Sequence, residues 1–220
     1  MSVHPSVLAD AEDLDRAVAS GRAVFSAGSW KNKPASERGR VLQRFADLFE
    51  AELDELAQME ADEAGKTISA AREELSWSIE LLRYAATLAW NMPGRLVDQE
   101  GADKLGLVTY EPLPVIAMIL PWNFPTVTLF QKLPYALVAG CSVVIKPSEM
   151  TAGTTLRYAA IARPSAITDA TIPFSTNGSS MRAMPTIPPA SITSTKVNGT
   201  DQIARPPIWA LSTPTLIIAS

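Results

Sequence analysis

Two predicted buried strands, the continuous apolar run Val115–Leu120 and the segment Ser142–Lys146, constrain the fold of this chain more than any other feature. An apolar run without alternation is expected of a strand that is buried on both faces. The segment between the runs, Thr126–Ala139, has helical character, with a kink or break expected at Pro134 and an end at Gly140. A strand, a helix and a strand within roughly 30 residues have the size of a parallel crossover unit. We therefore expect this region to belong to an open parallel α/β sheet.

The region before about residue 98 is predicted to be helical. Apolar residues recur there at three- and four-residue steps, which is typical of helices with one buried face. The predicted helices are Asp10–Phe25, a helix capped by Ser36 that stops at Gly65, and a helix from about Thr67 to the breaker pair Pro93-Gly94. A short alternating strand begins near Gly106. The predicted fold class is α/β, with N-terminal helices followed by the start of an open parallel, Rossmann-like sheet.

The C-terminal segment 164–220 differs in composition from the rest of the chain. It is rich in Ser, Thr and Pro, it contains no Glu, and its acidic residues are Asp169 and Asp201. Since it shows no sustained periodicity, we predict an irregular tail after an N-terminal portion of a domain at 1–163. The change of composition falls inside a predicted helix, whereas linkers normally follow a completed element. We interpret it as a shift of the reading frame near Arg163.

Composition excludes several classes of function. The 220 residues carry a formal net charge of −4, which supplies no basic surface for nucleic acid or for an anionic membrane. The longest apolar runs are too short and too often interrupted to span a bilayer. The N-terminus shows no targeting pattern, so we expect a cytoplasmic protein. One cysteine, Cys141, and one histidine, His4, leave no cluster for a transition metal.

Two loops follow the predicted strands, at the edge where open α/β sheets gather their ligands. The first is "PWNFP" and contains the carboxamide of Asn123; the second is "KPSE". Glu149, just past the second strand, stands close to where dinucleotide folds keep an acid for the ribose hydroxyls, and a carboxylate there repels a 2′-phosphate. Lys146 adds a cation with three donors. The glycine-rich turn of the ordinary pyrophosphate cradle is absent.

Each of these features also has a purely structural interpretation. Prolines around a strand end often only fix a loop, and "KPSE" can be a solvated turn in which Ser148 caps the next helix. Cys141 fits a small buried residue better than a nucleophile, because no histidine or second base lies near it in sequence. The segment "EAGKT" (Glu63–Thr67) resembles the end of a phosphate-binding loop, but Glu60 occupies the position of that motif's first glycine.

Taken together, the two loops carry a family resemblance. The stretch "ILPWNFPTVTLFQKLPYALVAGCSVVIKPSEMTAGTTL" closely resembles the aldehyde dehydrogenase superfamily, in which Pro-Trp-Asn-Phe-Pro precedes Ala-Gly-x-x-Val-Val-x-Lys-Pro-Ser-Glu at this spacing. The helical segments "ERGRVLQRFADLF" and "MEADEAGKTISAAREEL" are similar to the N-terminal helices of that family. The resemblance covers roughly residues 8–163.

The resemblance implies an NAD(P)-dependent oxidation of an aldehyde to a carboxylic acid in a homo-oligomeric family. Asn123 would be the side-chain donor of the oxyanion hole, a role that requires a preorganised group. Prolines on both sides and packed aromatic rings would provide that rigidity. The cofactor is expected to be NAD rather than NADP, because of Glu149. The residues expected to contact it are Ile119, Pro121, Trp122, Lys146, Ser148 and Glu149.

The chain departs from the family pattern in its second half. The "FTGS" segment, the general-base Glu and the nucleophilic Cys of the family are not found, and Cys141 matches a variable position. We therefore expect a truncated, inactive member of the family. The alternative is a non-catalytic protein that binds the cofactor or joins an oligomer. With the rest of the sheet missing, we also expect exposed apolar faces on Val115–Leu120 and Val143–Ile145.

Overall fold

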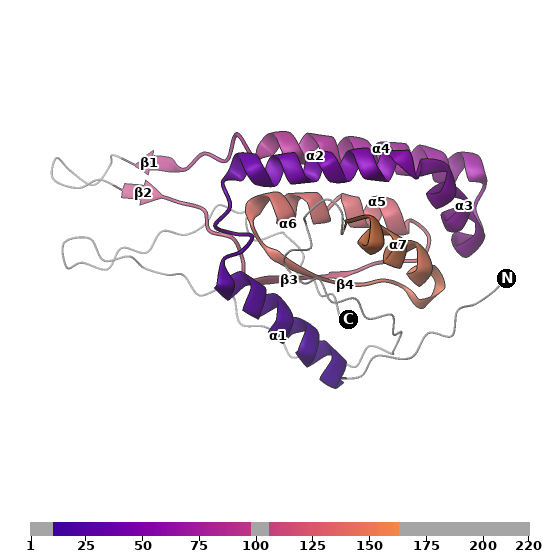
Figure 1. Cartoon of the computed structure of the whole chain (residues 1–220), viewed down its shortest axis with the longest axis horizontal. Helices are drawn as coiled ribbons and strands as arrows, with labels where there is room; N and C mark the ends of the chain where they lie inside the picture. The colour runs from indigo at the N-terminus through magenta and orange to yellow at the C-terminus, as the bar shows by residue number, and fades with distance from the viewer. Residues whose placement is uncertain (1–10, 98–105, 163–220) are drawn as a thin grey trace.

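The computed structural model describes residues 11–97 and 106–162 of the chain, which form layers of helices around a parallel pair of strands (Figure 1). The strands are β3 (Val115–Ile119) and β4 (Ser142–Lys146). Helix α1 (Ala11–Ala27) covers one face, and the opposite face is covered by α5 (Pro125–Phe130), α6 (Leu133–Ala139) and α7 (Ala152–Ala162). An outer layer holds α2 (Ala35–Ala51) and α4 (Ile68–Leu88), with α3 (Leu53–Ala64) at one end.

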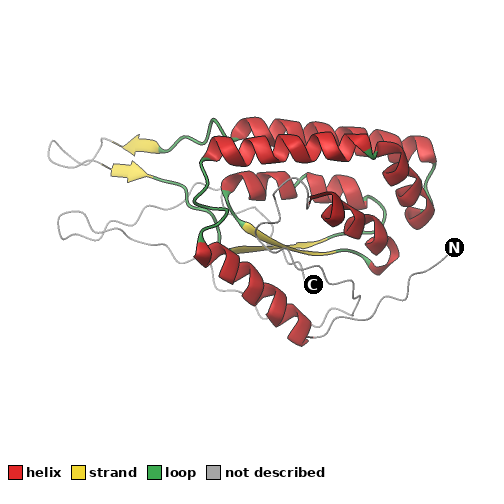
Figure 2. Cartoon of the chain, viewed as in Figure 1, coloured by secondary structure: helices red, strands yellow, loops and turns green. Residues whose placement is uncertain are grey.

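The predicted crossover unit is confirmed. Strands β3 and β4 pair in parallel from Val115↔Ser142 to Ile119↔Lys146, and α5 and α6 connect them. The predicted exposure of the apolar strand faces is wrong except at Ile119. Helices lie on both faces, so Val115 and Ile116 are partly buried, and Val143, Val144 and Ile145 are 9%, 2% and 4% exposed. The α/β fold class is therefore confirmed, as the alternation of helix and strand in Figure 2 shows.

The second predicted helix is two helices. The chain leaves helical geometry at Glu52 (φ −107°, ψ 12°), which separates α2 from α3. No glycine or proline marks this break, so local sequence does not predict it. The turn lets α3 pack against α4 and α7 and bury Leu56 and Ala57. The predicted cap was also wrong: Ser36 lies within α2, whose first N–H groups bond to the carbonyl of Pro34.

The connection between the strands follows the proline and glycine rules closely. The helical stretch is interrupted at Gln131–Lys132, and Pro134 falls in the first turn of α6. A proline ring clashes with the preceding turn of a continuous helix, so the break precedes it. Gly140 ends α6 at φ 99°, and a Cβ there would lie 3.4 Å from the Cα of Lys31. The glycine thus turns the chain directly into β4.

An aromatic cluster joins the helical layers. The rings of Phe49 and Phe130 have centroids 4.9 Å apart, and those of Phe49 and Tyr158 are 5.0 Å apart. Phe45 completes the cluster and is 1% exposed. Large buried aromatic rings contribute strongly to core stability. The cluster fixes α2, α5 and α7 relative to one another.

A short antiparallel ribbon extends away from the helical layers (Figure 1). It consists of β1 (Arg95–Val97) and β2 (Gly106–Val108). The strand near Gly106 is confirmed, whereas β1 was missed because Arg95–Val97 shows no apolar–polar alternation. The predicted tail at 164–220 lies outside the described residues, and its division from 1–163 stays a prediction. Among the described residues, no helix combines the length and the apolar character needed to cross a bilayer.

Candidate functional site

The two predicted loops meet at one edge of the sheet. Ile119, the last residue of β3, is the direct partner of Lys146, the last residue of β4. A further backbone bond continues the ladder, because Leu120 N–H donates to the carbonyl of Lys146 at 3.0 Å. The chain leaves both strands in the same direction from this pair. The "PWNFP" and "KPSE" loops therefore both begin at the carboxyl edge.

Ile119 and Lys146 lie on the face of the sheet that α1 covers. A Cβ at Gly21 of α1 would lie 3.2 Å from Val115 and 3.7 Å from Val144, so these two side chains face α1. Alternate residues of a strand share a face, which places Ile119 with Val115 and Lys146 with Val144. Ile119 is 46% exposed whereas Val144 is buried. The edge thus presents an apolar side chain beside an ammonium group.

The loop after β3 presents Asn123 at the surface. Trp122, Asn123 and Phe124 form a bend between β3 and α5, and all three are exposed. Phe124 is the N-cap residue of α5, and its carbonyl accepts from Thr128 N–H at 3.1 Å. Pro125 begins the helix and is buried. The expectation of packed aromatic rings around Asn123 was wrong, since Trp122 is 47% and Phe124 49% exposed.

The loop after β4 is built around a serine cap. The Ser148 hydroxyl accepts from Met150 N–H at 3.3 Å at the start of the 3₁₀ helix η1 (Glu149–Thr151). This confirms the capping interpretation of Ser148, while its contact with a cofactor stays a prediction. Lys146 Nζ donates to the carbonyl of Pro147 at 3.1 Å. Glu149 and Met150, the next two residues, are both exposed.

Cys141 has the environment of a structural residue. It is 4% exposed, and burial raises the pKa of its thiol, while the nearby Arg38 opposes this rise. A reactive cysteine needs a lowered pKa and access to solvent. The structural interpretation of Cys141 agrees with these findings. Among the described residues, no group of three metal-ligating side chains comes together.

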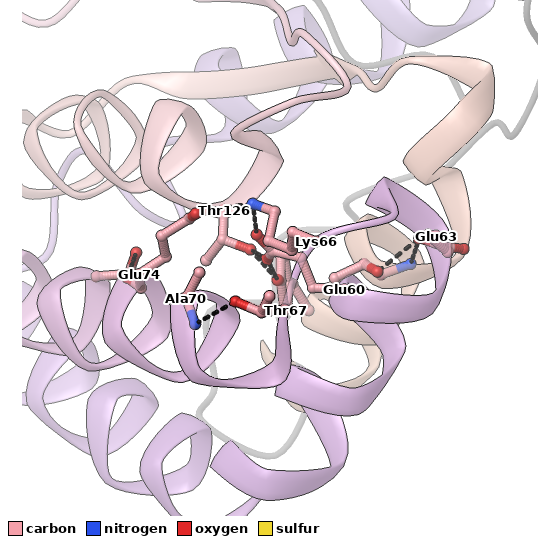
Figure 3. Close-up of polar contacts among 10 residues, drawn as sticks. Glu60, Glu63, Lys66, Thr67, Ala70, Glu74 and Thr126 are labelled. Carbon is pink, nitrogen blue, oxygen red and sulfur yellow. Dashed lines mark hydrogen bonds and ion pairs between the residues drawn. The ribbon is translucent and has the colours of Figure 1, made fainter.

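A buried polar cluster contacts Phe124 and Thr126, which follow Asn123, and sequence reasoning missed it (Figure 3). Its centre is Glu60 of α3, which is 0% exposed. Lys66 Nζ donates to Glu60 Oε1 at 2.8 Å and to Glu74 Oε2 at 2.7 Å. Glu60 Oε2 accepts from the hydroxyl of Thr126 and, at 3.3 Å, from that of Tyr158. We call these five residues the Glu60 cluster.

Burial raises the pKa of two members of the Glu60 cluster. Burial raises the pKa of Glu74, with Glu60 adding to the rise and the Lys66 ammonium opposing it. Burial also raises the pKa of Tyr158 well above its ordinary value, and Glu60 adds to this effect. Tyr158 therefore remains a neutral donor. Glu60 and Glu74 both pair with the Lys66 ammonium group, so the cluster contains one more carboxyl group than cations.

A comparison with protein families assigns the chain. The model described as the aldehyde dehydrogenase family matches residues 4–174. The chain belongs to the aldehyde dehydrogenase family. Among curated relatives, aminoacetaldehyde dehydrogenase of Pseudomonas aeruginosa is 41% identical over 162 residues, which are 72% of this chain and 32% of that protein. Human aldehyde dehydrogenase 1A1 is 42% identical over 154 residues, covering 69% of this chain and 30% of that protein.

Solved structures give the same family. A crystal structure of an NAD-dependent aldehyde dehydrogenase from Sinorhizobium meliloti aligns with a TM-score of 0.70 and 42% identity, over 73% of this chain and 32% of that one. A betaine aldehyde dehydrogenase from Staphylococcus aureus in complex with NAD+ aligns with a TM-score of 0.70 and 31% identity, over 73% and 32%. The chain thus spans about a third of the length of the relatives that it matches.

Proposed function

We propose that this chain provides the cofactor-binding edge and the oxyanion donor for an NAD-dependent oxidation of an aldehyde to a carboxylic acid. The observation that carries the proposal is the parallel pairing of Ile119 with Lys146, which brings the Asn123 loop and the Glu149 loop to one edge. Ligands of open α/β sheets bind beyond this edge. Family membership supplies the reaction class. We further propose that the protein acts in the cytoplasm.

The donor set at this edge fits a nicotinamide dinucleotide. Exposed apolar side chains (Ile119, Trp122 and Met150) can pack against flat rings, and the Lys146 ammonium and Glu149 carboxylate can bond ribose hydroxyls. A carboxylate at this place favours NAD over NADP because it repels a 2′-phosphate. When bound, NAD accepts the hydride that the aldehyde loses. The protein's part is to bind and orient the cofactor at the strand ends.

Asn123 would act on the aldehyde oxygen. Its carboxamide is exposed at the same edge and carries N–H groups that can donate to an oxyanion. Removing one such donor from an oxyanion hole typically lowers the rate by ~10²–10³. Pro121 and Trp122 precede it and would border the cofactor.

We propose that the 220-residue chain is inactive by itself. Aldehyde oxidation in the family needs a nucleophilic cysteine, and the single cysteine of this chain is buried with a raised pKa. We also interpret the Glu-free segment 164–220 as the product of a shifted reading frame. Resequencing the coding DNA around Arg163 tests that interpretation. A second frame that continues the Leu156–Arg163 helix supports it, and closed alternative frames contradict it.

Two assays of the 220-residue chain test the proposed function. In calorimetric titrations, NAD+ should bind the wild-type chain and should bind the Lys146→Met variant more weakly. Lys33→Met is the matched control, because Lys33 pairs with Glu37 on α2. In a second assay with NAD+ and a simple aldehyde, we expect no NADH. Absence of NAD+ binding contradicts the cofactor role, and turnover that Asn123→Ala abolishes contradicts the proposed inactivity.

A further inference from the structure

We propose that Lys66 and Glu60 are positioning residues for Asn123, holding its loop from behind at two points. The inference rests on the proposed function, because the orientation of Asn123 matters only if its amide meets an oxyanion. Neither side chain lies at the strand ends. Glu60 belongs to α3, and Lys66 belongs to the turn between α3 and α4. Both are far from the Asn123 loop in sequence.

The first point of contact is the ring of Phe124. Lys66 Nζ lies 5.0 Å from the centroid of that ring, within the range of a cation–π interaction. The ammonium group is held in place by Glu60 at 2.8 Å and Glu74 at 2.7 Å, and its side chain is 13% exposed. Phe124 directly follows Asn123. The contact therefore fixes the residue next to the carboxamide.

The second point of contact is the hydroxyl of Thr126. This residue is 0% exposed and lies in the first turn of α5, three positions beyond Asn123. Its hydroxyl donates to Glu60 Oε2, and it also bonds to the hydroxyl of Tyr158. Glu60 thus connects both points, since its other oxygen accepts from Lys66. One buried carboxylate therefore bonds both to Thr126 at the start of α5 and to the Lys66 ammonium (Figure 3).

The order of the Asn123 loop depends on these two contacts. Asn123 is exposed, and its aromatic neighbours Trp122 and Phe124 are about half exposed, so packing around the carboxamide is limited. An oxyanion donor contributes to catalysis only if it is already oriented before the charge develops. A misplacement of about 1 Å can reduce a rate by roughly 10²-fold. Order at Asn123 must therefore come from the residues that flank it.

A purely structural role makes a different prediction. Buried ion pairs are weak evidence for stability, because desolvation offsets much of the attraction. If the Glu60 cluster only joined α3 to α4, breaking it would loosen the whole chain evenly. The positioning role predicts a local loss of order at Asn123 in a chain that remains folded.

The test is a nuclear magnetic resonance relaxation measurement on the 220-residue chain without cofactor or aldehyde. We expect the backbone order parameter of Asn123 to fall from about 0.85 in the wild type to below about 0.6 in Lys66→Met. Lys66→Arg keeps the cation and should restore the wild-type value. Thr126→Val, which loses only the hydroxyl, should lower the order parameter in the same direction, and Thr126→Ser should restore it.

Arg83→Met is the control for loss of a cation that joins two helices away from the Asn123 loop, because Arg83 links α4 to the exposed Asp47 and Glu50 of α2. It should leave Asn123 unchanged. An unchanged order parameter in folded Lys66→Met overturns the proposal, as does equal loosening by Arg83→Met. If Lys66→Met does not fold, Thr126→Val decides in the same way. The measurement needs no NAD+, so an ordered loop in a chain that binds no NAD+ would overturn only the proposed function.

Discussion

The exposed carboxyl edge of β3 and β4 and the Glu60 cluster behind it differ in how their residues are distributed along the chain. The edge draws on two short segments, and the pairing of Ile119 with Lys146 joins them. The cluster connects Glu60 with Thr126, 66 positions away, and with Tyr158, 98 positions away. The residues proposed to meet the cofactor are thus local in sequence. The support that orients them is assembled only by the fold.

The largest expected effect on stability comes from Glu60→Ala. This change leaves the Lys66 ammonium and two hydroxyls buried without their common acceptor, and breaking a buried ion pair typically costs about 3–5 kcal/mol. The midpoint of urea unfolding should fall accordingly. Glu50→Ala is the matched control, because Glu50 is an exposed partner of Arg83 and its loss should leave the midpoint unchanged. Equal unfolding midpoints for the two variants would contradict the prediction that the Glu60 cluster contributes more to stability than the exposed ion pair of Glu50.

The next largest effect is expected from Gly140→Ala, at the turn into β4. At φ 99° an alanine is strained, and its Cβ would contact Lys31 and Pro112, so we expect a loss of about 1–3 kcal/mol. Gly65→Ala is the control, because Gly65 has φ 68° and nothing within 4 Å of its Cβ position. Thermal unfolding of both variants measures the difference. A larger loss for Gly65→Ala would contradict the strain assigned to the β4 turn.

A smaller, pH-dependent effect is expected from Glu74→Gln. Burial raises the pKa of Glu74 above its ordinary 4.5, so the folded state binds a proton that the unfolded state has already released. Stability should therefore fall as pH rises from about 4.5 through the raised folded pKa. Glu74→Gln should flatten this part of the stability profile, with Lys66 and Glu60 still paired. A profile identical to that of the wild type would show that Glu74 does not carry the proton.

The smallest expected effect on stability comes from Glu149→Ala, at the exposed edge. Loss of hydrogen bonds to a charged group should weaken NAD+ binding by roughly tenfold or more, since such bonds contribute about 1.5–3 kcal/mol. The preference for NAD+ over NADP+ should fall as well, while the unfolding midpoint stays the same. Parallel titrations with both cofactors measure this. An unchanged preference would contradict the assignment of Glu149 to the ribose.

Much of the fold could be predicted because its signals are local. The runs Val115–Leu120 and Ser142–Lys146 predicted the strands, and Gly140 predicted the end of α6. The break at Glu52 could not be predicted, because it arises from packing of α3 against other helices.

The site follows the same division. Asn123 and Glu149 stand in recognisable loops, whereas Lys66 appeared in a failed phosphate-loop motif and in a helical segment with no assigned chemistry. Its bonds to Glu60 and Glu74 become visible when α3 and α4 are placed together. The sequence did contain a signal for these bonds. A lysine that stands among acidic residues, between two predicted amphipathic helices, indicates ion pairs. The identity of those partners required the fold.

The most direct test of the cofactor edge is a titration of the 220-residue chain with NAD+, followed by heteronuclear NMR. Backbone resonances of residues 119–123 and 146–149 should shift together with one dissociation constant, while those of β1 and β2 stay in place. Shifts confined to one of the two loops, or no shifts at either, would contradict the proposal that β3 and β4 present a single cofactor-binding edge.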